Sequence, residues 1–182
     1  MLKKLTINKY NETIYYDKLD NGLEVYMWPQ TNVSNFYATL SVKYGSIDTE
    51  FKIGNETQKV SKGIAHFLEH VKFNEGPNKT AHDYYNKLGS SINAFTTFDY
   101  TAYEVLASAN LKENITHLLD YVETPYFTKE LIEKERKIIL NEVKMGKNNP
   151  YQVLYYHLNN ALFHNNQSIM LLGMKKMLRI LL

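Results

Sequence analysis

Two histidines, His66 and His70, stand four residues apart in the segment His66-Phe67-Leu68-Glu69-His70. Because residues i and i+4 lie on one face of an α-helix, both imidazoles can reach a single ion there, at about 2.0–2.1 Å from a zinc. A catalytic zinc still needs a third protein ligand and an open fourth position. The motif therefore predicts a helix that carries a metal on one face, and a distant segment that folds against it.

Glu69 directly precedes His70 and lies one position off the line that joins the two histidines. From there its carboxylate can reach a water beside the metal and take its proton, instead of binding the metal itself. The order His-x-x-Glu-His is the signature of the inverzincins. Chance would produce it in roughly a few per thousand chains of this length. We interpret the motif as the site of a metallopeptidase.

The third ligand is predicted in residues 135–143, whose apolar side chains recur at helical spacing. Glu142 is the candidate, and Glu135 precedes it by two helical turns, on the same face. One carboxylate can bind the metal while the other orients a neighbour or a water. Glutamates spaced in this way more often form a solvated helix face, so the pattern alone leaves both interpretations open.

The predicted elements are typical of an α+β fold. Asn21-Gly22 between two apolar runs is a strong signal for a β-hairpin, and Thr80 is predicted to cap a short helix that ends at Gly89. The other expected elements are strands at 13–16, 23–27, 35–43, 91–97 and 100–108, and helices at 62–73, 112–122, 128–147 and 151–163. We predict an antiparallel sheet with helices packed on one face.

Composition argues against several classes of function. The chain has 182 residues, is 44% hydrophobic and carries a formal net charge of +2, without the basic stripe typical of nucleic-acid-binding proteins. It has no cysteine, so the predicted metal depends on histidine and carboxylate alone. The start of the chain lacks the apolar core of a secretory signal, and no apolar run approaches the roughly 18 residues of a spanning helix. We expect a cytoplasmic protein with neither a nucleic-acid partner nor a membrane span.

The residues around the histidine motif resemble the core of the M16 peptidase family, which includes pitrilysin, insulin-degrading enzyme and the mitochondrial processing peptidase. Several motifs occur in the family's order, a far more specific match than any one of them. They are Asn21-Gly22-Leu23-Glu24-Val25-Tyr26, Tyr44-Gly45-Ser46, Gly63 to His70 followed by Phe73, Asn93-Ala94-Phe95-Thr96, Glu135-Arg136 and Asn141-Glu142. Within the family, the chain looks most like the bacterial insulinase-like peptidases of the YmfH/YmfF type.

This resemblance implies a zinc-dependent metalloendopeptidase that cleaves peptides or unfolded segments, with the M16 half-domain fold shared by LuxS-like metallohydrolases. It implies one zinc ion per chain, bound by His66, His70 and Glu142. Glu69 would be the general base, and Glu135 would be the supporting carboxylate of the catalytic site.

The strand at 91–97 matters for substrate binding if it lies at the edge of the sheet. An extended peptide can pair with the free backbone groups of an edge strand and present its scissile bond to the metal. The resemblance implies this substrate-binding role for Asn93, Ala94, Phe95 and Thr96. The alternative is an ordinary hairpin of the core.

The resemblance extends to about His164. We expect an incomplete N-terminal peptidase domain over residues 1–164 and a divergent, apolar and basic tail over 165–182. The tail fits a truncated or frame-shifted product better than an amphipathic helix for a membrane surface or a partner. The family would continue into a second domain of the same fold, so we expect such a domain or self-association as a partner. The alternative function is that of a non-catalytic peptide-binding fragment.

Overall fold

The computed structural model describes residues 2–10 and 12–163. The chain divides into two compact units, Met1–Asn35 and Phe36–Leu182. The predicted tail, 165–182, lies outside the described residues, so the division between residues 1–164 and this tail stays a prediction. Among the described residues, no helix has the length and apolar character needed to cross a membrane.

The first unit is a three-stranded antiparallel sheet in the order β1-β2-β3. Its elements are β1 (Lys3–Ile7), the 3-10 turn η1 (Asn8–Tyr10), β2 (Glu12–Lys18) and β3 (Glu24–Met27). The predicted turn joins β2 to β3: Gly22 has a φ of 91°, and the Asn21 side chain accepts a hydrogen bond from the Leu23 amide at 3.0 Å. The hairpin prediction is confirmed, whereas β1 was not predicted.

The second unit is built on an antiparallel sheet in the order β4-β10-β9. Its strands are β4 (Phe36–Val42), β9 (Ser91–Thr96) and β10 (Thr101–Ala107). In the central strand, Tyr103 stands opposite Leu40 of β4 and Ala94 of β9. β9 is therefore an outer strand of this sheet.

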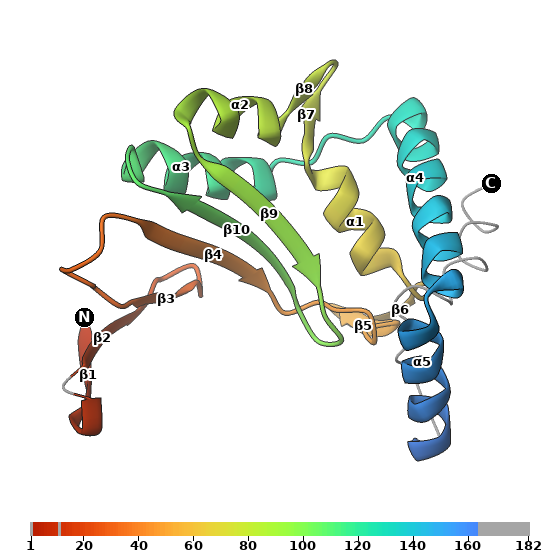
Figure 1. The fold of residues 1–182 in the computed structure, drawn as a ribbon, viewed down its shortest axis with the longest axis horizontal. Helices are drawn as coiled ribbons and strands as arrows, with labels where there is room; N and C mark the ends of the chain where they lie inside the picture. Colours follow the sequence, from red (N-terminus) through yellow and green to blue (C-terminus); the bar gives the residue numbers. More distant parts are fainter. Residues whose placement is uncertain (1, 11, 164–182) are drawn as a thin grey trace. The chain divides into compact units, whose positions relative to one another are not determined.

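Within residues 36–163 the structure contains five helices. They are α1 (Ile64–Lys72), α2 (Ala81–Leu88), α3 (Leu111–Glu123), α4 (Lys129–Asn148) and α5 (Pro150–Leu162). Helices α1, α2 and α3 lie on the same side of the sheet, and α4 packs against α1 (Figure 1). The predicted α+β fold, with helices on one face of an antiparallel sheet, is confirmed.

Helix α2 begins and ends where its sequence predicts. The Thr80 hydroxyl accepts from the Asp83 amide at 3.3 Å, and the Asp83 carboxylate accepts from the Thr80 amide at 2.9 Å. This reciprocal capping box satisfies backbone donors that the helix itself leaves unpaired. Gly89, with a φ of 68°, ends the helix in the left-handed region, which glycine adopts without a steric penalty.

Two short hairpins connect the larger elements and were not predicted. The first joins β5 (Glu50–Ile53) to β6 (Glu56–Lys59), and the second joins β7 (Asn74–Gly76) to β8 (Lys79–Thr80). The four strands are two to four residues long, too short for a reliable alternating pattern.

The described part of the second unit has two apolar cores. The first lies between α1 and α4 and contains Phe67, Val71, Leu131, Ile139 and Val143. The second lies between the sheet and helices α2 and α3, and its buried residues are Ala81, Tyr85, Tyr103, Val105, Ala107, Leu118 and Tyr121. Helix α1 contacts both α4 and the sheet, so its orientation depends on packing from two directions.

Gly45 follows β4, where the chain passes close to the turn between β9 and β10. The Ser46 amide donates a hydrogen bond to the Thr97 carbonyl at 2.9 Å. A Cβ atom at position 45 would collide with the backbone of Phe98 and Asp99. Glycine is therefore required for this close approach of two backbones.

We expect Gly45→Ala to lower the free energy of unfolding by about 2 kcal/mol, because the added methyl group must displace backbone rather than a flexible side chain. Gly76→Ala is the matched control, since its Cβ would lie 3.8 Å from the Lys79 Cβ, an ordinary contact. Its effect should stay within about 0.5 kcal/mol. Denaturant unfolding measures both, and equal effects would contradict the close-approach argument.

Candidate metal centre

Helix α1 packs against strand β9 on one side and helix α4 on the other. Gly63, with a φ of 89°, precedes it and lets the chain turn into the helix at Ile64. The apolar face of α1 carries Phe67 and Val71 into the core shared with α4. This packing sets the rotation of the helix and leaves its polar side chains at the two margins of the buried face.

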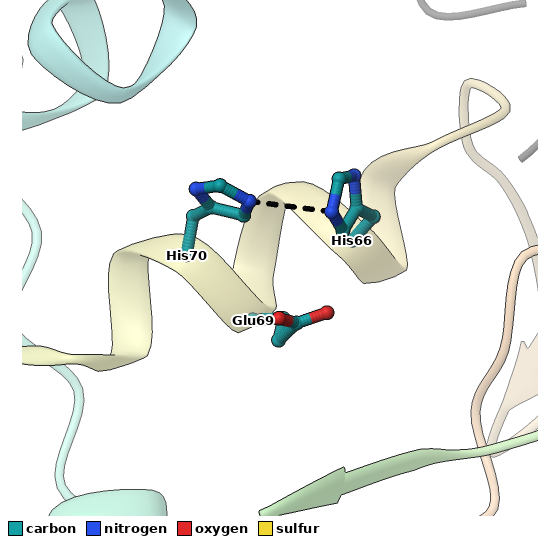
Figure 2. A group of neighbouring side chains, drawn as sticks. All are labelled: His66, Glu69 and His70. Atoms are coloured by element: carbon teal, nitrogen blue, oxygen red, sulfur yellow. Dashed lines mark hydrogen bonds between the residues drawn. The ribbon is translucent and has the colours of Figure 1, made fainter. Parts of the chain in front are cut away.

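His66 and His70 face each other along α1, one helical turn apart. Their Nε2 atoms are 3.2 Å apart, and their rings stand at 90° to each other. Figure 2 shows the two nitrogens turned toward one another, with the Glu69 carboxylate directed to a different side of the helix. The histidine side chains are 15% and 18% exposed, so they are shielded but still reachable from solvent.

Helix α4 brings two carboxylates to these histidines. The Glu142 Oε2 atom lies 3.8 Å from His66 Nε2 and 3.5 Å from His70 Nε2. The Glu135 Oε2 atom lies 3.6 Å from the other nitrogen of His70, Nδ1. The structure thus brings together the five polar residues predicted from the two helical segments, which are His66, Glu69, His70, Glu135 and Glu142. Their roles as metal ligands and catalytic groups stay predictions.

The donor atoms fit a tetrahedral zinc-type ion. At bond lengths of about 2.0–2.1 Å, two nitrogens on a tetrahedral centre stand about 3.3 Å apart, and the two Nε2 atoms are 3.2 Å apart. Glu142 Oε2 completes a triangle of similar size. The imidazole and carboxylate set, without sulfur, is one that catalytic zinc sites use.

A second carboxylate lies within reach of the same centre. Among the described residues, His66, Glu69 and His70 form a group whose potential ligand atoms all lie within 4.8 Å of one another. Glu69 and Glu142 thus both stand close to the two histidines, and proximity alone does not say which of them binds a metal. Their other contacts differ.

Glu69 is buried, with 7% exposure, and points to β9. The hydroxyl of Thr96 donates a hydrogen bond to its Oε2 atom at 2.7 Å. Burial raises the pKa of Glu69 although the Thr96 hydrogen bond and His70 act in the opposite direction. A carboxylate with a raised pKa is a better proton acceptor in general base catalysis.

The two histidines differ in their affinity for protons. Burial, followed by the neighbouring charge of His70, lowers the pKa of His66 to about 4, so His66 is neutral near pH 7, as a metal ligand must be. Burial also acts to lower the pKa of His70, but the hydrogen bond to Glu135 and the charges of Glu142 and Glu69 outweigh it and raise the pKa.

Asn74 supports the site but was missed by the sequence analysis. Its side-chain amide donates to the carbonyls of His70 and Val71, each at 3.4 Å, and reaches Glu135 Oε1 at 3.5 Å. It therefore ties the end of α1 to the carboxylate beside His70. Asn74 is the first residue of the short strand β7, just after the C-cap of α1, where no periodic pattern indicates which way a side chain points.

The predicted substrate strand is β9, an outer strand of its sheet. Its side chains alternate in direction. Ile92 and Ala94 pack against the core below the helices, and Thr96 is buried and contacts Glu69. Asn93 is exposed, and Phe95 contacts Tyr100 edge to face. The substrate-binding role stays a prediction, but Thr96 has a side-chain contact that the sequence did not reveal.

The chain belongs to the insulinase family, peptidase family M16. The family model matches residues 30–174. The uncharacterized zinc protease YmfH of Bacillus subtilis is 42% identical over 158 residues, which cover 86% of this chain and 37% of that protein. An uncharacterized zinc protease of Rickettsia bellii is 30% identical over 156 residues, covering 84% of this chain and 36% of the relative. The resemblance to the YmfH type is confirmed.

The fold agrees with a solved structure of the same family. The crystal structure of an M16-like peptidase from Alicyclobacillus acidocaldarius superposes with a TM-score of 0.86 at 32% sequence identity. The match covers 93% of this chain and 40% of that chain. The chain thus spans somewhat more than a third of the length of these relatives, and activities of the whole relatives are not transferred to it directly.

We expect added Zn²⁺ to raise the melting temperature of the chain and His66→Ala to abolish the increase. A ligand that binds only the folded state stabilises it, by about 2.7 kcal/mol at a hundredfold excess over the dissociation constant. His157→Ala is the control, because His157 is exposed on α5. A zinc-dependent increase that persists in His66→Ala, or disappears in His157→Ala, would contradict the site.

Proposed function

We propose that this chain is the zinc-binding part of a metalloendopeptidase that hydrolyses peptides or unfolded segments, with one zinc ion per chain. The supporting observation is that His66 and His70 of α1 and Glu142 of α4 lie close together. The separations of their donor atoms are near those of ligands on one tetrahedral ion. Membership of the insulinase peptidase family supports the same function.

The proposed chemistry divides the polar residues into ligands and proton carriers. His66, His70 and Glu142 hold the ion, which when bound supplies a Lewis acid to the peptide carbonyl and lowers the pKa of water. Glu69 is not needed as a ligand and accepts a proton from the attacking water. The protonated Glu69 then returns the proton to the leaving amine.

Glu135 and Asn74 orient the site. A metal-binding histidine usually donates its second ring N–H to a carboxylate, which fixes the tautomer and the ring orientation. Glu135 Oε2 stands 3.6 Å from His70 Nδ1, on the side of the ring that faces away from His66. We assign to Glu135 the role of supporting carboxylate.

The substrate is proposed to bind along β9. As an outer strand, β9 pairs with β10 on one side and can offer its other backbone edge to an extended peptide. Asn93, Ala94, Phe95 and Thr96 would bind mainly through their backbone. Selectivity would then depend more on whether a peptide can become extended than on one side-chain pocket.

A partner is part of the proposal, because the relatives are more than twice as long as the matching region. We propose that a second M16-type domain or a second copy of the chain completes the enclosure around the substrate. The alternative function is that of a peptide-binding fragment that does not cleave its ligand, since β9 serves both functions. The cytoplasmic location stays a prediction.

Glu69→Gln should keep zinc and lose hydrolysis. The amide cannot accept the proton, and loss of a general base typically costs about 10²–10⁴ in rate. Zinc content and cleavage of a quenched fluorescent peptide are measured on the same preparations, together with the oligomeric state. Glu130→Gln, an exposed position in the first turn of α4, is the control with the same change in charge.

Cleavage that persists undiminished in Glu69→Gln would overturn the assignment of the base. Zinc binding without cleavage in the wild-type chain, with a peptide still bound, would favour the peptide-binding fragment. Absence of zinc in the wild-type chain would contradict the proposed peptidase chemistry as a whole.

Glu142→Gln and Glu135→Gln should weaken zinc binding to different extents. Residues that support a ligand typically change metal affinity about 10–100-fold, so we expect a loss of this size for Glu135→Gln and a larger loss for Glu142→Gln. Competition with a chromophoric chelator measures both dissociation constants. A larger effect at Glu135 than at Glu142 would reverse the two assignments.

A further inference from the structure

Glu69 could serve either as a metal ligand or as a proton acceptor, and the two roles exclude each other. The Glu69 carboxylate is close enough to share an ion with His66 and His70, and carboxylates are good zinc ligands. A carboxylate that binds the ion would fill the open position that a catalytic site requires. It would also lose its availability as a proton acceptor.

One hydrogen bond directs the Glu69 carboxylate toward β9. The Thr96 hydroxyl donates to Glu69 Oε2 at 2.7 Å, a distance typical of a strong O–H···O⁻ bond. Both residues are buried, with 4% and 7% exposure, so water competes weakly for this bond. Among the described residues, Thr96 is the hydrogen-bond donor that contacts the Glu69 side chain.

The position of Thr96 is itself fixed by the sheet. The alternation along β9 places Thr96 on the same face as Ile92 and Ala94, toward the helices. The neighbouring Thr101 hydroxyl lies 3.4 Å away and donates its own proton to the Tyr44 carbonyl at 2.9 Å. The Thr96 proton is assigned to Glu69 because the carboxylate is much nearer, at 2.7 Å against 3.4 Å, and because an ionised carboxylate can only accept.

We propose that Thr96 is a positioning residue that holds the Glu69 carboxylate toward β9 and so prevents it from binding the metal. The inference rests on the proposed function, in which Glu142 is the third ligand and Glu69 is the base. It adds a division of roles: Glu142, which is partly exposed and lacks such a restraint from the sheet, binds the ion.

The test replaces zinc with Co²⁺ in the chain and uses Thr96→Val, which removes the hydroxyl but keeps the branched shape. The released Glu69 should enter the coordination sphere. We expect a changed visible absorption spectrum of Co²⁺, which reports ligand number and geometry, and metal affinity higher by about tenfold, at the lower end of the range for residues that support ligands.

The spectral change caused by Thr96→Val should depend on the Glu69 carboxylate. In the double variant Thr96→Val with Glu69→Gln, the spectrum should match that of Glu69→Gln alone. Thr96→Ser keeps the hydroxyl and should restore the wild-type spectrum. Thr101→Val is the control for a merely structural role, because it removes a buried hydroxyl beside Thr96 but leaves the donor to Glu69 in place. If Thr96→Val does not fold, Thr96→Ala gives the same comparison with a smaller side chain.

A wild-type spectrum and affinity in Thr96→Val or Thr96→Ala would overturn the inference and leave the metal site intact. A spectral change that persists when Glu69 is glutamine, or that Thr101→Val reproduces, would also overturn it. Absence of Co²⁺ binding in the wild-type chain would overturn the proposed function and this inference together. The two failures are therefore distinguishable without measuring hydrolysis.

Discussion

The candidate site depends on the packing of α1 between α4 and β9. Val71 and Ile139 are 1% and 0% exposed, and burying side chains of this size contributes about 1.5–3 kcal/mol each. Rotating α1 would expose these apolar groups, so the apolar contacts fix the directions of its polar side chains. With this rotation, His66 and His70 face the glutamates of α4, and Glu69 faces Thr96 of β9.

Three carboxylates gather around two histidines, and their environments differ enough to separate their roles. Glu69 is held by a hydroxyl from the sheet, Glu135 is buried beside His70 and reached by Asn74, and Glu142 is the most exposed of the three. Carboxylates this close to one another repel when ionised. A divalent cation removes that repulsion and is the largest local charge in such a site, which favours a metal over a simple ion-pair network.

Much of this arrangement was predictable because the relevant patterns are local. Helical periodicity placed Glu135 and Glu142 on one face, and the capping signals of Thr80 and Gly89 located α2. The unpredicted parts depend on contacts between distant segments. Asn74 lies just after the end of α1 and donates a hydrogen bond to the His70 carbonyl. Gly45 allows the close approach of the turn between β9 and β10. Neither leaves a periodic signal in its own segment, and the short hairpins β5-β6 and β7-β8 have too few residues to show one.

In strand β9 the sequence predicts a role for the backbone, which is pairing with a peptide, but it does not reveal the hydrogen bond that the Thr96 side chain donates to Glu69. Among the described residues the outer place of β9 in the sheet leaves one backbone edge without a partner strand, the edge proposed for a peptide. The alternation of side chains directs Thr96 to Glu69. A peptide paired with β9 would thus be aligned by the same strand that orients the proposed base. The separation between the base and the scissile bond would then depend on the packing of α1 against β9. Catalytic groups that are held by such packing and by hydrogen bonds keep a productive geometry.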